Sequence, residues 1–408
     1  MNRELLKYLC LKDQTGIYGI PASAEDFDTN KVRYLRITDI SPDGNLLDND
    51  KKSVSSENIE KYILNDGDIV FARTGNSTGK TYYHESKNGI LAYAGFLIKY
   101  SLDPKKVNPK YLKYFTISNE YRTWVNNLSL GSTRGNINAQ TFSNCPILLP
   151  SRNQQDLLVS ILSSLDDKIE LNNRINSELE NLAKTIYDYW FVQFDFPDEN
   201  GTPYKSSGGK MVYNHELKRA IPAGWEVKKL SNIADITMGQ SPDGESYNEE
   251  KKGEIFFQGS TDFGWRFPTI RQYTTQPSRM AKKGDILLSV RAPVGTLNIA
   301  DNDCCIGRGL AALRSKSGFN SYLFYVMEYF KKTFDHRNNI GTTFGSITKD
   351  DLFNLKLVYP DKEHLKKYEL IVSKYNQLIL NNHLQNQQLT QLRDWLLPML
   401  MNGQITVK

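Results

Sequence analysis

The sequence predicts an α+β protein in which two similar α/β domains alternate with two long helices. Three observations support this prediction: a long apolar stripe with heptad spacing occurs twice, the segment before each stripe also repeats, and a polar, turn-forming linker separates the repeats. The expected organisation is a first domain at 1–150, a first long helix at 151–196, a linker at 197–224, a second domain at 225–360, a second long helix at 361–402 and a tail at 403–408.

The first long helix is predicted from residue 151 to about residue 190. Its apolar positions are three and four residues apart, which is the spacing of a coiled coil. The stripe runs through Leu158, Ile161, Leu165, Lys168, Asn172, Ile175, Leu179, Leu182, Ile186 and Tyr189. Ser151 is a suitable N-cap, and Gln154 completes a capping box. At a rise of 1.5 Å per residue the helix is roughly 60 Å long, too long for the interior of one compact domain.

The second long helix repeats this stripe at an offset of 210 residues, through Tyr368, Ile371, Tyr375, Leu378, Asn382, Gln385, Leu389, Leu392, Leu396 and Met399. Asn172 corresponds to Asn382. A polar residue on an apolar seam costs stability and fixes register, so we interpret both as register residues. We expect the two helices to pair; the alternative is two unrelated amphipathic helices, each lying on its own domain.

The domains repeat as well. Gly67 and Asp68 in one strand-like segment are matched by Gly284 and Asp285, and residues 131–150 align with 341–360 without a gap. We interpret the chain as a tandem duplication of domain and helix. If the helices pair, the second must run back along the first, which gives an antiparallel coiled coil with a pseudo-twofold axis.

Hydrophobic alternation and turn residues predict the elements of the first domain. Strands are expected at 32–41, 68–73, 89–100 and 145–150. One helix is expected before the last strand, with Leu112, Phe115, Tyr121 and Val125 near one face.

The composition excludes some classes of protein. The chain has 51 basic and 46 acidic residues, and its net charge of +5 permits nucleic acid as a partner without arguing for it. No apolar run reaches the roughly 18 residues of a membrane span, and the segment MNRELLKYLC lacks the apolar core of a signal peptide. The cysteines and histidines show no spacing typical of a metal site or a disulfide framework. We expect a cytoplasmic protein with no membrane association and no metal site.

Two segments of the sequence resemble catalytic motifs but do not match them. In ARTGNSTGKT, Gly75 and Gly79 enclose three residues where a P-loop needs four, and the matching turn VRAPVGT contains no lysine. We therefore interpret Lys80 as a basic side chain on a strand-ending turn. NPKY at 108–111 lacks the second proline of the pocket in which methyltransferases hold a flipped base. We expect no catalytic residue in this chain.

Several short sequence motifs follow one another in a specific order, and some of them occur twice. They are the GDIV and GDIL strands followed by a glycine turn, the GSTRGNI and GTTFGSI loops, LP before a long helix that contains LNN, WFVQFDFP with SSGGKMV, and LRDWLLPMLMNG near the end. Their order and duplication resemble the specificity subunits of type I restriction–modification systems, over essentially the whole chain.

The resemblance implies that each α/β domain is a target recognition domain that reads one half of a bipartite sequence in double-stranded DNA. It implies that the helices are a spacer and a docking surface for two methyltransferase subunits, and that a motor nuclease subunit completes the restriction complex. The specificity subunit of that family is non-catalytic, so S-adenosylmethionine and ATP are expected on the partner subunits and no cofactor in this chain. Because the domains have diverged in sequence, we expect an asymmetric target.

Loops in both halves are the expected DNA contacts. Arg73 and Arg291 follow the matched strands, where a guanidinium can reach guanine or phosphate. The other candidates are Asn76, Lys80 and Arg134 in the first domain, and Gln258, Arg266, Arg271, Arg308 and Thr343 in the second. The amide of Gln258 suits adenine. The alternative for each is a solvated surface residue or a salt-bridge partner.

An aromatic cluster at the end of the first helix consists of Tyr187, Tyr189, Trp190, Phe191, Phe194 and Phe196. Packing against the second domain is favoured over a docking patch for a methyltransferase.

Two other classes of function stay open. One is a structural coiled-coil adaptor whose globular heads bind protein, which the salt dependence of DNA binding would distinguish. The other is an enzyme whose heads hydrolyse nucleotides or cut nucleic acid. The incomplete P-loop and the lack of clustered carboxylates count against it.

Overall fold

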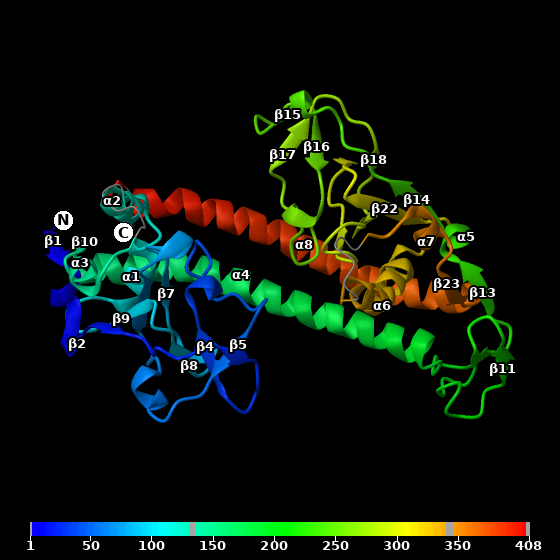
Figure 1. Cartoon of the computed structure of the whole chain (residues 1–408), viewed down its shortest axis with the longest axis horizontal. Helices are drawn as coiled ribbons and strands as arrows, with labels where there is room; N and C mark the ends of the chain where they lie inside the picture. Colours follow the sequence, from blue (N-terminus) through cyan, green and yellow to red (C-terminus); the bar gives the residue numbers. More distant parts are fainter. Residues whose placement is uncertain (1, 130–135, 340–345, 405–408) are drawn as a thin grey trace. The chain divides into compact units, whose positions relative to one another are not determined.

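The structure is a computed structural model that describes residues 2–129, 136–339 and 346–404 (Figure 1). The chain divides into two compact units: unit 1 is Met1–Leu171 with Asn386–Lys408, and unit 2 is Asn172–Gln385. Unit 1 contains the first α/β domain, called head one here (1–150), and unit 2 contains the second, called head two (225–360). Each unit also includes part of both long helices.

Head one is built around a four-stranded antiparallel sheet with the order β2-β9-β6-β7. Its strands are β2 (Cys10–Tyr18), β9 (Leu97–Leu102), β6 (Asp68–Ala72) and β7 (Thr81–Tyr83). A second sheet has the order β3-β5-β4-β8, formed by β3 (Glu25–Asp26), β5 (Lys52–Val54), β4 (Val32–Leu35) and β8 (Leu91–Tyr93). β1 (Asn2–Leu5) pairs with β10 (Pro146–Leu149).

The α-helices in the described part of head one are α1 (Pro109–Phe115), α2 (Asn119–Ser129) and α3 (Ala139–Ser143). The start of α1 follows from its sequence, because the Asn108 side chain accepts a hydrogen bond from Lys110 N and Pro109 occupies the first turn. All five residues of β6 are buried, as expected for a continuous apolar run in the centre of a sheet.

Head two has the same plan. Its first sheet has the order β14-β22-β19-β20, with β14 (Ala234–Met238), β22 (Leu310–Ser315), β19 (Ile286–Ser289) and β20 (Leu297–Ile299). The second has the order β15-β17-β16-β21-β18, with β15 (Tyr247–Asn248), β17 (Gln272–Thr274), β16 (Glu254–Phe257), β21 (Cys304–Ile306) and β18 (Met280–Ala281). β13 (Glu226–Lys229) pairs with β23 (Lys356–Tyr359).

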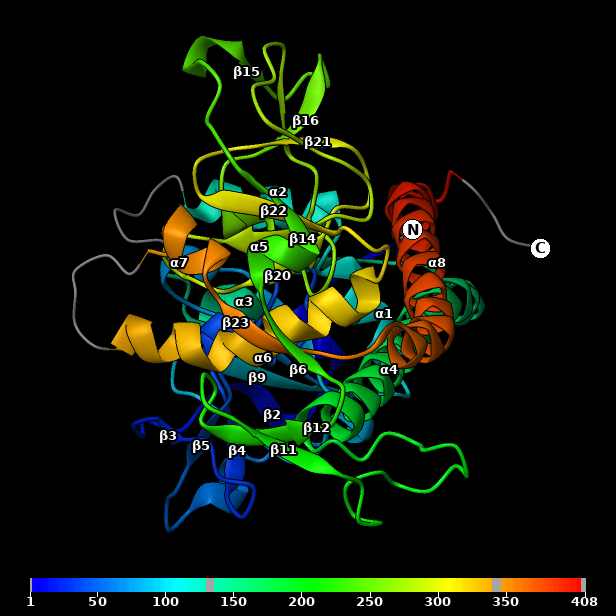
Figure 2. The same cartoon turned by 90° about the vertical axis from the view of Figure 1, so that its right-hand side faces the viewer.

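The helices of head two are α5 (Leu230–Ile233), α6 (Asn320–Asn339) and α7 (Lys349–Phe353), and α6 packs against β22 (Figure 2). The linker before head two forms a hairpin of β11 (Met211–Asn214) and β12 (Arg219–Pro222).

The correspondence of the two heads confirms the tandem repeat. Each head has an outer pair of strands, a four-stranded antiparallel sheet, and a second sheet that contains one parallel pair, β4 with β8 and β16 with β21. α3 and α7 differ by the offset of 210 that the sequence alignment gives for this segment.

Three elements of head one differ from the sequence-based prediction. The strand expected at 32–41 ends at Leu35, and a 3-10 helix at Ile37–Asp39 follows it. The single strand expected at 89–100 is two strands, β8 and β9, which belong to different sheets. The chain turns between them at Gly95, where a Cβ would lie only 3.3 Å from Ile20 O. The single helix expected before the last strand is also divided, into α1, which ends at Phe115, and α2, which begins at Asn119.

The long helices are α4 (Arg152–Tyr187), which continues as a π-helical turn at Asp188–Val192, and α8 (Lys362–Met401). α4 begins where predicted, and one half of the predicted capping box forms, since the Gln154 side chain accepts a hydrogen bond from Ser151 N at 3.2 Å. The Ser151 hydroxyl donates to the same Gln154 oxygen at 3.0 Å. In unit 1, Asp166 of α4 lies 3.2 Å from Arg393 of α8.

In unit 2, the side chains of α4 and α8 bond to one another in reversed order along the two helices. Asn172 donates to Gln385 at 2.8 Å, and Asn382 donates to Asn176 at 2.8 Å. Further along, Tyr368 Oη donates to Ala183 O at 3.2 Å. Within this unit the two helices therefore run antiparallel.

The buried stripe of α4 matches the heptad prediction only in part: Leu158 and Asn172 are buried as predicted, but three later positions are exposed. Ile175, Leu182 and Tyr189 are 38%, 50% and 43% exposed, whereas Asn176 and Ala183 are buried. The reason is that α4 packs against a head as well as against α8; Tyr325 of head two, for example, contacts Glu180 O at 3.5 Å. A helix that packs on two sides buries a wider face than a coiled-coil seam.

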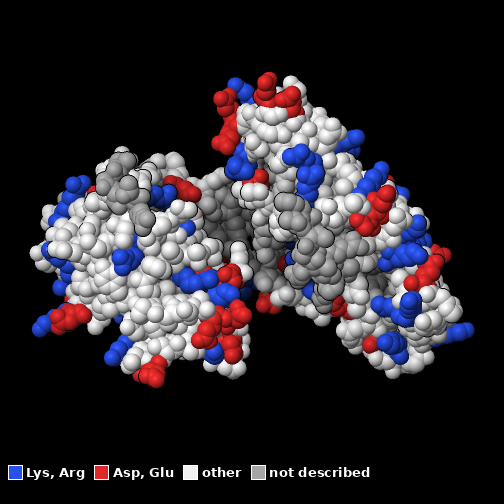
Figure 3. All heavy atoms as spheres, in the orientation of Figure 1, with Lys and Arg blue, Asp and Glu red and all other residues white. Residues whose placement is uncertain are grey.

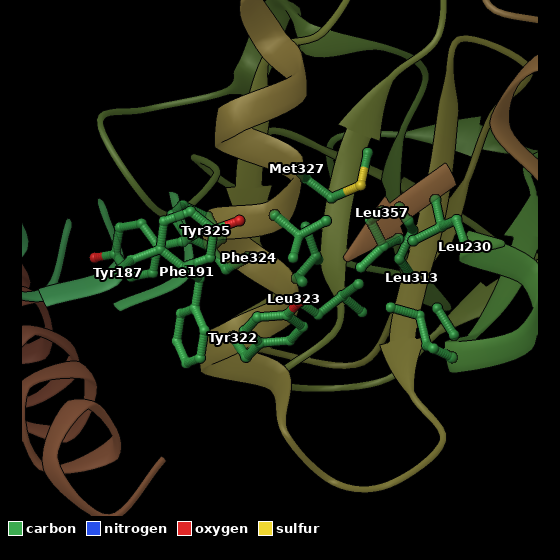
Figure 4. Close-up of a cluster of buried hydrophobic side chains, with 14 of the residues drawn as sticks. Tyr187, Phe191, Leu230, Leu313, Tyr322, Leu323, Phe324, Tyr325, Met327 and Leu357 are labelled. Atoms are coloured by element: carbon green, nitrogen blue, oxygen red, sulfur yellow. The ribbon is translucent and has the colours of Figure 1, made fainter. Parts of the chain in front are cut away.

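The aromatic cluster at the end of α4 packs into the core of head two, which confirms the favoured interpretation for most of its members (Figure 4). Tyr187 and Phe191 lie beside Tyr322 of α6, with ring centroids 6.0 and 5.0 Å away (Figure 4). Tyr189 is the exposed member of the cluster.

None of the described helices is both long enough and apolar enough to cross a membrane.

Candidate nucleic-acid interface

The two heads hold corresponding strand ends together with the same backbone hydrogen bonds, called the shared frame here. In head one they run from Gly19 N to Leu97 O, from Arg73 N to Phe96 O and from Ile137 N to Arg73 O, at 3.0, 3.0 and 2.9 Å. In head two they run from Gly239 N to Leu310 O, from Val290 N to Gly309 O and from Ile347 N to Val290 O, at 2.9, 2.9 and 3.0 Å. These equivalent hydrogen bonds show which residue of head one corresponds to which residue of head two.

Glycine is required where the chains of the frame approach most closely. A Cβ at Gly19 would lie 2.2 Å from Ala94 O, and a Cβ at Gly239 would lie 2.2 Å from Gly307 O. Both distances are shorter than side chains tolerate, so the same constraint fixes glycine at the same place in each head.

Arg73 and Arg291 both follow the matched strands, as predicted, but they are not equivalent. The shared frame equates Arg73 with Val290, so Arg291 lies one residue further along. The backbone of Arg291 instead forms a bridge with Ser346. The side chains of Arg73 and Arg291 are therefore attached at backbone positions that do not correspond.

Two side chains position the guanidinium of Arg73. It lies over the ring of Tyr18, 5.0 Å from the centroid, and its Nε donates to Asn136 Oδ1 at 3.3 Å. Tyr18 is held in turn because its hydroxyl accepts a hydrogen bond from Ala139 N at 3.1 Å. The frame and these contacts hold the plane of the guanidinium in one orientation.

The two other described candidates of head one lie on the turn that follows β6. Asn76 is exposed, and Lys80 is half-buried with its Nζ donating to Ile40 O at 3.2 Å. Lys80 thus has a structural partner, in keeping with a turn rather than a nucleotide-binding loop.

Arg291 and Arg308 of head two line one pocket of about 380 Å³ together with Lys349. The other lining residues are Met238, Val290, Ala292, Ser346, Ile347 and Thr348. This lining contains three cationic side chains and no carboxylate, so the pocket suits an anionic group such as a DNA phosphate.

Gln258 lies next to this pocket. Its amide contacts the hydroxyl of Ser241, at 2.9 Å from Nε2 and 3.1 Å from Oε1, and the same hydroxyl accepts a bond from Arg308 N at 3.3 Å. A Cβ at Gly309 would lie 2.8 Å from Gln258 O, so the turn that carries Arg308 is pressed against Gln258. The structure therefore brings Gln258, Arg291 and Arg308 together.

The structure does not bring Arg266 to this surface. Its side chain is 1% exposed, with Nη1 donating to Glu180 and Nη2 to Asn376, both at 2.7 Å. Burial raises the pKa of Glu180, and the charge of Arg266 opposes that rise. Because the Arg266 side chain is bonded to residues of both long helices, it is not available for contact with DNA.

The remaining candidates are separate from this group. Arg271 is exposed and bonded to Asp262 at 2.9 Å. Arg134 and Thr343 lie outside the described residues.

The distribution of charged side chains on the face seen in Figure 3 does not by itself locate an interface. Figure 3 shows basic and acidic side chains interspersed over the face in view. Among the described residues, no group of three His, Cys, Asp or Glu side chains is arranged to hold a metal ion.

Comparison with known proteins decides the family. The family model described as the type I restriction modification DNA specificity domain matches twice, at residues 18–181 and 222–393, and each match includes one shared frame. The putative type I restriction enzyme MjaX specificity subunit of Methanocaldococcus jannaschii is 31% identical over 364 residues, which are 88% of this chain and 83% of that protein. The chain belongs to the family of type I specificity subunits.

Further relatives agree with this membership. The HindI specificity subunit of Haemophilus influenzae is 22% identical over 85% of this chain and 88% of its own length. The crystal structure of the S subunit of a type I restriction-modification system from M. genitalium shares the fold, with a TM-score of 0.57 and 17% identity over 98% of this chain and 95% of that one.

As a type I specificity subunit, the chain is a DNA-recognition protein. The duplicated family domain does not favour the adaptor that binds only protein through its heads.

Sequence reasoning missed Tyr18, Asn136, Ser241 and Lys349. Asn136 and Lys349 were recoverable, because Asn136 lies within the GSTRGNI string and Lys349 lies two residues after GTTFGSI. Tyr18 carried no signal, since its role depends on the pairing of β2 with β9.

Proposed function

We propose that head one and head two each read one half of an asymmetric, bipartite sequence in double-stranded DNA. The observation that carries this proposal is the shared frame: one backbone arrangement occurs twice, and the side chains that it presents differ between the heads. Arg73 and Tyr18 are at the frame positions where head two has Val290 and Met238. Identical frames with different side chains suit two different half-sites.

The long helices are the spacer between the half-sites in this proposal. α4 has 36 residues and α8 has 40, which at the rise of an α-helix are about 54 and 60 Å. The polar pairs between Asn172 and Gln385 and between Asn176 and Asn382 support an antiparallel coiled coil whose register is fixed. Asn172 and Asn382, interpreted from the sequence as register residues, are proposed in that role.

We assign no catalysis to this chain. Methylation is expected from two methyltransferase subunits that carry S-adenosylmethionine, and cleavage from a motor nuclease subunit that uses ATP. The exposed apolar side chains of the long helices, Leu182, Leu370, Leu378, Leu392 and Trp395, are the proposed docking contacts for the methyltransferases. The cytoplasm is the proposed location.

A selection from random duplexes tests this proposal. The complex of the chain with its methyltransferase partner is incubated with a random library, and the retained duplexes are sequenced at increasing salt. We expect two short motifs at one fixed distance, with affinity that falls steeply as salt rises. Retention that enriches no motif would contradict the proposal and favour protein ligands of the heads.

A further inference from the structure

Arg73 differs in its charge environment from the other described arginines of unit 1. Each of those arginines forms an ion pair with a carboxylate: Arg3, Arg33, Arg36, Arg122, Arg152 and Arg393. No carboxylate of a described residue pairs with Arg73. Its positive charge is thus available for a ligand, while its neighbours are neutral groups that orient it.

Its contacts leave one edge of the guanidinium available. Nε is taken by Asn136 and one face is covered by Tyr18, but neither Nη donates to a described residue. Two parallel N–H groups on a planar, pre-oriented cation match two acceptors lying side by side. A surface arginine that only neutralises phosphate needs no such support, because a point charge suffices for that contact.

We propose that Arg73 reads a guanine in the half-site of head one, with its two Nη groups donating to O6 and N7. Tyr18 and Asn136 are positioning residues that hold the guanidinium in plane for this contact. The proposal rests on the function proposed above and adds the base that head one recognises. Guanine is the base whose major-groove edge presents two adjacent acceptors.

The corresponding place in head two lacks this arrangement. The frame equates Tyr18, Arg73 and Asn136 with Met238, Val290 and Ser346, which offer neither an aromatic face nor a cation. The cationic side chains of head two, Arg291 and Arg308, lie at positions other than the one that corresponds to Arg73. Head two therefore does not read guanine at the equivalent point of its own half-site.

Substitution of Arg73 by Lys tests the role of the paired donors, because it keeps the charge and removes the fork. The variant is co-expressed with the methyltransferase partner in a host without adenine methylation, and modified sites are mapped across the genome. We expect one G·C position in one half-site to lose its preference by roughly 10- to 100-fold, with the other half-site and the gap unchanged. Retention of that second half-site shows that the variant folds and assembles.

Arg122→Lys is the matched control, since Arg122 is an exposed arginine of the same head that is paired with Asp43. It should leave the motif intact. Tyr18→Ala should relax the same G·C position as Arg73→Lys, and Tyr18→Phe, which keeps the ring but loses the hydrogen bond from Ala139 N, should relax it less.

An unchanged motif with uniformly weaker methylation in Arg73→Lys would show a phosphate contact and overturn the proposal. Absence of any motif with the natural chain would instead overturn the proposed function.

Discussion

Arg266 shows how one buried cation connects a loop of head two to both long helices. It bonds Glu180 of α4 and Asn376 of α8, and it lies over the ring of Phe324 at 4.2 Å. Asn376 continues the network to Ser321 of α6 at 2.9 Å. Because Glu180 depends on this partner, the network is sensitive to the loss of one member.

We expect Arg266→Met to lower the free energy of unfolding of unit 2 by about 3–5 kcal/mol, since it removes the buried cation that pairs with the partly buried carboxylate of Glu180. Chemical denaturation followed by tryptophan fluorescence measures this. Arg271→Met is the matched control: its ion pair is exposed, so its loss should cost only about 0–1 kcal/mol. Equal losses in both variants would show that the burial of Arg266 has no energetic consequence.

The sequence could not predict this role for Arg266. Trp265, Arg266 and Phe267 follow a glycine in a polar stretch, which is typical of an exposed loop. The partners of Arg266 are 86 and 110 residues away in the chain. By contrast, the position where α4 begins and the offset of 210 residues that relates α3 to α7 followed from the sequence, and both were predicted correctly.

The candidate site was predictable in part for the same reason. Arg73, Arg291 and Arg308 follow recognisable strands, whereas the one-residue difference between Arg73 and Arg291 depends on hydrogen bonds between strands that are distant in sequence. The stacking of Tyr18 on Arg73 likewise joins two strand ends.

At the scale of elements, Asp166 connects α4 to α1 and to α8 within unit 1. It accepts hydrogen bonds from Lys113 at 2.9 Å, from Tyr114 at 3.0 Å and from Arg393 at 3.2 Å. Burial would raise the pKa of Asp166, but the charges of Lys113 and Arg393 and the hydrogen bonds outweigh it and lower the pKa below its usual value of 3.8.

The lowered pKa predicts how stability depends on pH. A carboxylate with a lowered folded-state pKa contributes stability above its unfolded-state pKa, and this contribution is lost as pH falls through the folded-state pKa. We expect Asp166→Asn to lower the melting temperature of unit 1 at neutral pH and to have progressively less effect below about pH 4. A difference in melting temperature that is constant with pH would show that the charge of Asp166 is not involved.

The pairing of Asn176 with Asn382 predicts a compensating pair of substitutions. Asn382→Leu should cost about 1–3 kcal/mol, because Asn176 is 3% exposed and loses its partner. Asn176→Leu added to it should restore most of that stability, since two apolar side chains replace the polar pair. A double-mutant cycle measured by thermal unfolding checks this, and additive losses would contradict it.

At the scale of the whole molecule, the spacer role predicts that the length of the helices sets the length of the gap. A heptad inserted after Leu171, with a matching heptad after Gln385, adds about 10.5 Å to each helix and keeps its faces in register. We expect the non-specific gap of the target to widen by about three base pairs while both half-sites are retained. A methylated motif whose gap is unchanged would show that the helices do not determine the spacing.

The shared frame explains at this scale how a duplicated protein can recognise an asymmetric sequence. Its hydrogen bonds are formed by main-chain atoms and its glycines are common to both heads, so the same frame can form with different side chains at the variable positions. Those positions are therefore free to diverge, and a change in one head should alter one half-site only.

Genome-wide mapping of methylated adenines tests the central claim most directly. The natural chain is co-expressed with its methyltransferase partner in a host without adenine methylation, and every modified site is sequenced. The account predicts a single asymmetric motif with two half-sites and a fixed gap. A palindromic motif, or a complete complex that methylates without sequence preference, would contradict it.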